Sequence, residues 1–227
     1  MEEREPRPAV DRTKRQALLD EIEQHFDVKL LWFKRLPSPG HRDDVTTHAF
    51  FDPDRRLTDD LKLEIRCRME GQGWQFSRQM VPVLGNDAQR REHVYLAPMI
   101  RVAAEVGYHA TRRASVPSIM ERGLLPSAPE RQTTESRWDC EGNIFLCENL
   151  GTPADAGVRG SGSAHWWLDH LAHNNRFGDP DWVILRVEVG RLKDARVYQD
   201  VWSESGVIVG GIAALPPEVI ELEYAAR

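Results

Sequence analysis

Hydrophobic residues recur at two different spacings along this chain, which predicts a mixture of helices and strands. In the N-terminal half, Leu18, Ile22 and Phe26 repeat at helical spacing and predict a helix over about residues 13–25. Short apolar runs bounded by polar, proline and glycine positions predict strands over residues 28–33, 46–51 and 74–83.

The segment 61–69 fits either a strand or a helix, because its apolar and polar residues alternate strictly. Thr58 followed by Asp59 and Asp60 is typical of a helix cap with an acidic first turn. The Gly-Gln-Gly sequence that begins at Gly71 is a good helix end. We therefore favour a helix and keep the strand as the alternative.

In the C-terminal half, an apolar run over residues 102–106 leads into Tyr-His-Ala-Thr and then into a short helix over about residues 116–122. Ser115 occupies an N-cap position, Pro117 lies in the first turn, and Gly123 follows the helix. We expect His109 at the end of a strand, beside a loop. Its imidazole titrates near neutral pH and is able to donate or accept a hydrogen bond.

Further strands are predicted over residues 143–147, 182–189, 201–209 and 215–222. Thr152 and Pro153 predict the start of a short helix. A second helix follows Ser163, and we expect four of its apolar residues to anchor it to the sheet: Trp166, Trp167, Leu168 and Leu171. The succession of strands and short helices predicts an α+β fold.

Composition narrows the class of protein. The 227 residues are 41% hydrophobic and 29% charged, as in an ordinary soluble globular protein, and the formal net charge of −6 argues against non-specific nucleic-acid binding. The charged N-terminus is unlike a signal peptide, and no apolar stretch approaches the roughly 20 residues that span a bilayer. We expect a cytoplasmic protein with no membrane partner.

Metal and nucleotide-binding motifs are missing from the sequence. Cys67, Cys140 and Cys147 have neither the spacing of a zinc site nor that of a disulfide framework. His170 and His173 share a helical face, but no third ligand is correctly spaced, so we expect no metal. The sequence also lacks the glycine-rich dinucleotide and phosphate-loop motifs and the nucleophile elbow of hydrolases.

Four segments of the C-terminal half, in order, resemble the tRNA 2′-phosphotransferase family, a branch of the ADP-ribosyltransferase superfamily. That family has Tyr-His-Gly-Thr before a short helix that ends in Gly-Leu, then a strand with a central His. A third strand follows, and then Ser-x-Asn-Gly-Val before Val-Pro-Pro-Glu. The counterparts here are residues 108–124, 143–147, 183–189 and 203–220. The resemblance implies split small β-sheets with short helices, and NAD as the substrate.

The sequence departs from that family at several positions. Ala110 replaces the glycine after the histidine, Phe145 replaces the central histidine of the second strand, and Val207 falls where most ADP-ribosyltransferases have Glu. Glu204 lies close by and is the carboxylate that a shifted register brings to that role. The stretches that hold the RNA phosphate in 2′-phosphotransferases are missing.

The resemblance also implies roles for individual residues. His109 and Glu204 are the expected catalytic residues: His109 holds the nicotinamide ribose, and Glu204 stabilises the cation left when nicotinamide departs. Phe145 is expected to stack on the nicotinamide ring, and the main chain of Ala110 to pair with the nicotinamide amide. The remaining expected NAD-binding residues are Tyr108, Thr111, Arg112 (or Arg113), Arg159 and Val207.

Three functions follow as hypotheses. The first is an NAD-dependent ADP-ribosyltransferase that modifies a protein or nucleic-acid acceptor and releases nicotinamide. The second is an RNA 2′-phosphotransferase that uses NAD, and the third is an inactive module that binds NAD or a partner. We expect a disordered tail over residues 1–12, an N-terminal α+β region of unknown role over residues 13–100, and the catalytic domain over residues 101–227.

Overall fold

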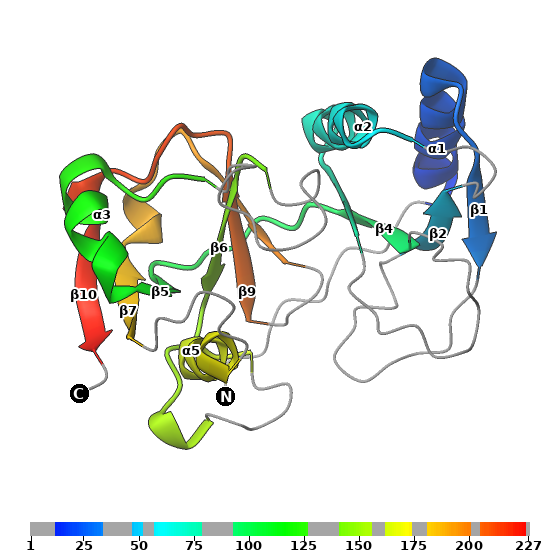
Figure 1. The fold of residues 1–227 in the computed structure, drawn as a ribbon. Helices are drawn as coiled ribbons and strands as arrows, with labels where there is room; N and C mark the ends of the chain where they lie inside the picture. Colours follow the sequence, from blue (N-terminus) through cyan, green and yellow to red (C-terminus); the bar gives the residue numbers. More distant parts are fainter. Residues whose placement is uncertain are drawn as a thin grey trace. The chain divides into compact units, whose positions relative to one another are not determined.

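The computed structural model describes residues 12–33, 47–51, 57–78, 93–126, 141–155, 162–173, 181–200 and 205–225. These residues form four α-helices and two antiparallel sheets, an α+β arrangement (Figure 1). The chain divides into two compact units, with the boundary between Met99 and Ile100.

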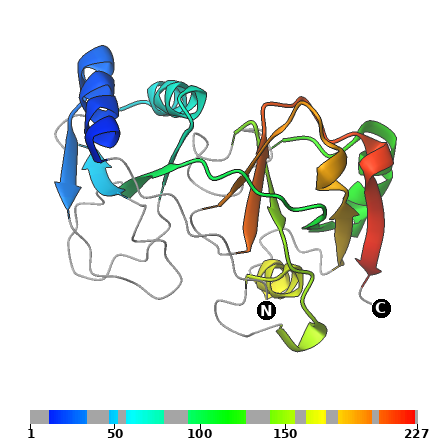
Figure 2. The same ribbon diagram turned by 180° about the vertical axis from the view of Figure 1, so that it is seen from behind.

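The first unit contains two helices and a four-stranded antiparallel sheet of order β1-β2-β4-β3. The helices are α1 (Arg12–Phe26) and α2 (Asp59–Gly71). The strands are β1 (Leu30–Phe33), β2 (Thr47–Phe51), β3 (Trp74–Arg78) and β4 (His93–Pro98). Figures 1 and 2 show the two helices next to each other at one side of this sheet.

The segment that fitted either a strand or a helix is helical, and local interactions explain why. The side chain of Thr58 accepts a hydrogen bond from the N–H of Leu61 at 3.2 Å, which satisfies one of the free donors of the first turn. Gly73 has a φ of +81°, a conformation that suits glycine after a helix end. Ile65 and Met69 are fully buried, so the tertiary packing also favours the helix.

The second unit is built on a six-stranded antiparallel sheet of order β10-β7-β5-β6-β9-β8. Its strands, in chain order, are β5 (Gly107–Arg112), β6 (Asn143–Cys147), β7 (Trp182–Val187), β8 (Arg196–Gln199), β9 (Gly206–Gly210) and β10 (Ile220–Ala225). Strands that lie far apart in the sequence are therefore neighbours at the centre of this sheet.

Each face of this sheet is covered by a different helix. The main apolar core lies on the face that packs against α3 (Val116–Arg122), and it includes Ile119, Leu185 and Val207. On the other face, α5 (Ala164–His173) packs mainly on β5 and β7, where Ala164 contacts Cys147 and Ile184. We call these the α3 face and the α5 face.

The structure corrects the expected position of His109. The strand that contains it is Gly107–Arg112, so His109 lies inside the strand and not at its end, while residues 102–106 are outside any strand. The reason is pairing: β5 pairs with β7 along all six of its residues, and His109 lies opposite Leu185. Ser115 precedes α3 as expected, but its side chain makes no capping hydrogen bond.

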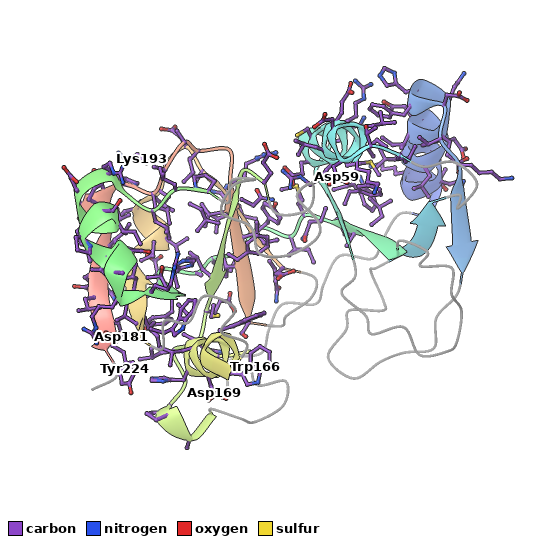
Figure 3. The ribbon with its side chains drawn as sticks, in the orientation of Figure 1. Asp59, Trp166, Asp169, Asp181, Lys193 and Tyr224 are labelled. Carbon is purple, nitrogen blue, oxygen red and sulfur yellow. The ribbon has the colours of Figure 1, made fainter. Side chains whose placement is uncertain are left out.

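The anchoring of α5 also differs from the expectation. Ser163 accepts a hydrogen bond from the N–H of Trp166 at 3.2 Å, so the predicted cap is correct. Among the α5 side chains that the structure describes, Ala164 and His165 are buried, Leu168 packs on the same cluster as predicted, and Trp167 is 38% exposed. The side chain of Leu171 lies outside the described residues. Trp166 and Trp167 stack edge to face on each other, and Figure 3 shows Trp166 and Asp169 projecting from α5.

The last strand begins later than the sequence indicates. Leu215 forms an isolated pair with Leu124, and a 3-10 turn (Pro217–Val219) follows before β10 starts at Ile220. Two consecutive prolines explain the shift, because neither has an N–H to donate to a neighbouring strand. The predicted strand over residues 201–209 is seen from Gly206 onward, and residues 201–204 lie outside the described part of the chain.

Candidate functional site

The six-stranded sheet is split near its centre, between β5 and β6. All other neighbouring strands pair over four or more residues, whereas β5 and β6 share one position, Tyr108 opposite Cys147. In the same register, Ala110 of β5 would lie opposite Phe145 of β6, but their main chains do not pair. The two strands therefore diverge, and each lines one side of the split.

His109 bridges the split with its side chain. Its Nδ1 lies 3.0 Å from the carbonyl oxygen of Phe145, although the two residues are 36 positions apart. A carbonyl oxygen only accepts hydrogen bonds, so Nδ1 carries the proton and donates. In the neutral ring, this leaves Nε2 as a hydrogen-bond acceptor.

Burial keeps this imidazole neutral. Removal of the ring from water lowers the pKa of His109 below its usual value of 6.5, and the hydrogen bond to Phe145 opposes that shift only in part. His109 as a whole residue is partly exposed. Its imidazole ring is nevertheless packed among protein atoms, which is why it is desolvated. At neutral pH, the His109 side chain is therefore uncharged.

His109 and Phe145 approach the split from different faces of the sheet. His109 lies opposite Leu185, whose side chain is in the core of the α3 face, so its side chain starts from that face. Phe145 lies two residues before Cys147, which belongs to the α5 face. The imidazole and the aromatic ring therefore start from opposite faces of the sheet beside the split.

The other predicted residues of β5 alternate between the two faces. Tyr108 packs into the apolar cluster under α5, so its side chain fills that cluster. Thr111 shares the α3 face with His109, and Ala110 and Arg112 share the α5 face with Tyr108. Ala110 has no positive φ, so an alanine fits at the position where the resembled family has glycine.

Of the remaining predicted residues, the structure describes Val207 alone, and it does not line the split. Val207 is fully buried in the α3-face core, opposite Leu146, and contributes packing there. Glu204 and Arg159 lie outside the described residues. Their described neighbours are close together, because the hydroxyl of Ser205 donates to the carbonyl oxygen of Gly162 at 2.8 Å.

Arg113 is committed to a partner at the end of β5. Its main-chain N–H donates to the carbonyl oxygen of Asp181 at 2.9 Å, and its side-chain Nε lies 2.6 Å from the Asp181 carboxylate. Both side chains are about half exposed, so the pair holds the starts of α3 and β7 together at the surface. The other predicted arginine, Arg112, lies opposite Trp182 on the α5 face.

Sequence reasoning overlooked Asp200, a carboxylate at the end of β8, two strands from β6. The N–H of Asp200 donates to the carbonyl oxygen of Gly206 at 2.8 Å, directly after the last pair of β8 with β9. Gly206 in turn lies opposite Cys147. The short strand β8 was missed, and with it the signal that Asp200 lies in register with the site.

In the described part of the chain, no cluster of three or more His, Cys, Asp and Glu side chains has the arrangement of a metal site. The same residues contain no helix with the length and apolar character needed to cross a bilayer. No family model matches the sequence, and no match was found among curated proteins. The site's geometry and chemistry therefore carry the functional argument.

Proposed function

We propose that this protein is an NAD-dependent ADP-ribosyltransferase that transfers ADP-ribose to a protein or nucleic-acid acceptor and releases nicotinamide. The observation that carries the proposal is the split sheet with His109 fixed across it. A sheet that opens beside an acceptor nitrogen and an aromatic ring supplies the two contacts that a nicotinamide riboside needs. The order of the motifs around these strands, an ADP-ribosyltransferase-like arrangement, supports the same reading.

The residues of the split have distinct tasks in this proposal. Nε2 of neutral His109 accepts a hydrogen bond from a ribose hydroxyl, while its Nδ1–H stays on the Phe145 carbonyl and fixes the ring. The ring of Phe145 stacks against the nicotinamide, which is a purely apolar contact with no hydrogen bond to the base. The main chain of Ala110 pairs with the nicotinamide amide, and Arg112 contacts the diphosphate.

Chemistry at the site requires little beyond positioning and charge. The bond between the ribosyl carbon and the nicotinamide nitrogen breaks, and its electron pair leaves with the nicotinamide, which becomes neutral. The ribosyl carbon is left with a positive charge, and a nearby carboxylate stabilises it. Glu204 is the residue that the sequence assigns to that task, and an acceptor held in line then attacks the carbon.

The test is incubation of the protein and a cell lysate with NAD labelled in its adenylate phosphate, followed by separation of protein and nucleic acid. Label on either fraction, lost in His109→Ala and kept in His25→Ala, supports the proposal, because His25 is an exposed residue of the first unit. Release of ADP-ribose 1″,2″-cyclic phosphate from a 2′-phosphorylated RNA indicates the phosphotransferase reaction instead. Protection by NAD against thermal unfolding without release of nicotinamide indicates a binding module.

A further inference from the structure

One row of residues crosses the sheet at the closed end of the split. Tyr108 lies opposite Cys147, Cys147 opposite Gly206, and Gly206 opposite Asp200. Residues opposite each other in a sheet direct their side chains to the same face. Asp200, Cys147 and Tyr108 therefore share the α5 face, although they come from two strands and the end of a third.

Gly206 places no side chain in the middle of this row. Because glycine has no side chain, no group of its own separates Asp200 from Cys147 on this face. The charge of Asp200 does reach the thiol: the pKa of Cys147 is raised to about 12, first by burial and second by the negative charge of Asp200. Two strand spacings, roughly 10 Å, separate the main chains of Asp200 and Cys147. The carboxylate is at the tip of the Asp200 side chain, so it can be closer to Cys147 than the Asp200 main chain is.

Phe145 belongs to the same surface. It lies on the α5 face two residues before Cys147 and opposite Ile208. Cys147 and Ile208 are buried, whereas Phe145 and Asp200 keep exposed surface. A buried floor is thus flanked by an aromatic ring on one side and a carboxylate on the other. An aromatic cation that stacks on Phe145 finds a negative charge on the same face of the sheet.

We propose that Asp200 is a catalytic carboxylate of the transferase, which faces the ribosyl carbon as nicotinamide departs and stabilises the positive charge that develops there. The inference rests on the proposed function, and it adds a residue beside the sequence-assigned Glu204. With water as the acceptor, the C–N bond breaks with its electrons on nicotinamide. Water then adds to the ribosyl carbon and loses a proton to solvent, giving ADP-ribose. A carboxylate in this partly desolvated position acts more strongly than one in bulk water.

The test compares two charge-removing substitutions in the full chain. Asp200→Asn keeps the shape and removes the charge, and Asp194→Asn does the same at an exposed position just before β8. Two quantities are measured for each: the rate of nicotinamide release from NAD in water, and the rise in melting temperature that NAD produces. We expect Asp200→Asn to slow release about 100-fold with an unchanged NAD-induced rise, and Asp194→Asn to change neither. Asp200→Glu, which keeps the charge, should retain more activity than Asp200→Asn.

The outcomes separate this inference from the proposed function. If the unmodified protein neither releases nicotinamide nor is stabilised by NAD, the proposed function is wrong and the role of Asp200 is wrong with it. If the unmodified protein is active and Asp200→Asn is equally active, only the role of Asp200 is wrong. An Asp200→Asn variant that loses the NAD-induced rise as well has lost the binding site, and this result also contradicts a catalytic role.

A second measurement tests the placement of Asp200 without any ligand. In a background of Cys67→Ser and Cys140→Ser, Cys147 is the remaining thiol, and its ionisation is followed by thiolate absorbance as the pH is raised. Asp200→Asn should lower the pH at which Cys147 ionises, whereas Asp194→Asn should leave it unchanged. An unchanged midpoint in Asp200→Asn contradicts the proximity on which the inference depends.

Discussion

The imidazole of His109 takes the place of main-chain ladder bonds between β5 and β6, by donating from Nδ1 to the carbonyl oxygen of Phe145 at 3.0 Å. This one side chain therefore does two things. It satisfies a carbonyl group that the split would otherwise leave without a strand partner, and it fixes the orientation of the ring, whose Nε2 is the acceptor in the proposed function. Stability and binding are expected to depend on the same protonation state.

The first prediction is that His109 makes stability depend on pH. Because burial lowers its pKa in the folded chain, the unfolded chain binds a proton first as the pH falls. The contribution of neutral His109 is therefore complete above about pH 6.5 and decreases as the pH falls toward the lower folded pKa. Urea unfolding of the unmodified protein and of His109→Gln over this range should show a stability difference that narrows on acidification.

A matched control uses the exposed His25 of α1. The same measurement on His25→Gln controls for the loss of a histidine that lies in the first unit. A difference between the unmodified protein and His109→Gln that stays constant on acidification would show that the ring titrates normally. In that case the assigned Nδ1–H donor and neutral Nε2 acceptor would be wrong.

Much of the secondary structure follows from local sequence. Thr58 and Gly73 fix the ends of α2 by capping chemistry that acts within a few residues, so the correct choice between helix and strand was available from sequence alone. The end of β5 and the start of β10 were not predictable in this way. They depend on β7, which lies far along the chain from β5 and pairs with both strands.

The sequence named candidate residues for the site, but their arrangement did not follow from it. The motif around Tyr108 singled out His109, and the segment 143–147 singled out Phe145, but the sequence gives no sign that β5 and β6 pair at one position only. Asp200 shows the limit most clearly, since it approaches Cys147 only through the register of two other strands. Registers of this kind depend on tertiary packing and not on local propensity.

The second prediction concerns Gly123, at the end of α3. Its φ is +87°, and a Cβ at this position would overlap the carbonyl oxygen of Leu215. That oxygen accepts from the N–H of Leu124 at 3.0 Å, in the pair that joins α3 to the segment before β10. Gly123→Ala should therefore destabilise the protein by about 3 kcal/mol or more, through both strain and loss of this pair.

Gly71 provides a control of opposite sign. It is the last residue of α2, is exposed, and has no atom within 4 Å of an added Cβ. Gly71→Ala should leave stability unchanged or raise it by about 0.5–1 kcal/mol. Chemical denaturation of both variants measures the effect, and a similar loss in the two would contradict the steric argument.

The third prediction concerns a group of charges between β7 and β10. Arg191 and Arg186 both donate to Glu188, and in that order they lower its pKa. The stabilisation that ionised Glu188 provides is therefore complete above its usual pKa of 4.5. It is lost as the pH falls through the lower pKa that Glu188 has in the folded protein. Glu188→Gln should lower the melting temperature at neutral pH and low salt, and the difference should shrink at high salt. Glu223→Gln, at an exposed position on β10, is the control and should change little.

The fourth prediction separates the two arginines that follow His109. Arg113 is held by Asp181 through its main chain and its Nε, whereas Arg112 lies opposite Trp182 on the α5 face, the face of Phe145 and Asp200. If Arg112 contacts the diphosphate, Arg112→Ala should weaken NAD binding about 10- to 100-fold, as expected for loss of a hydrogen bond to a charged group. Arg113→Ala should cost up to about 1 kcal/mol of stability, the scale of a half-exposed ion pair, and leave NAD affinity within about twofold. Calorimetric titration of NAD into both variants tests this prediction. A larger loss of affinity in Arg113→Ala than in Arg112→Ala would show that Arg113 is the residue that contacts the diphosphate.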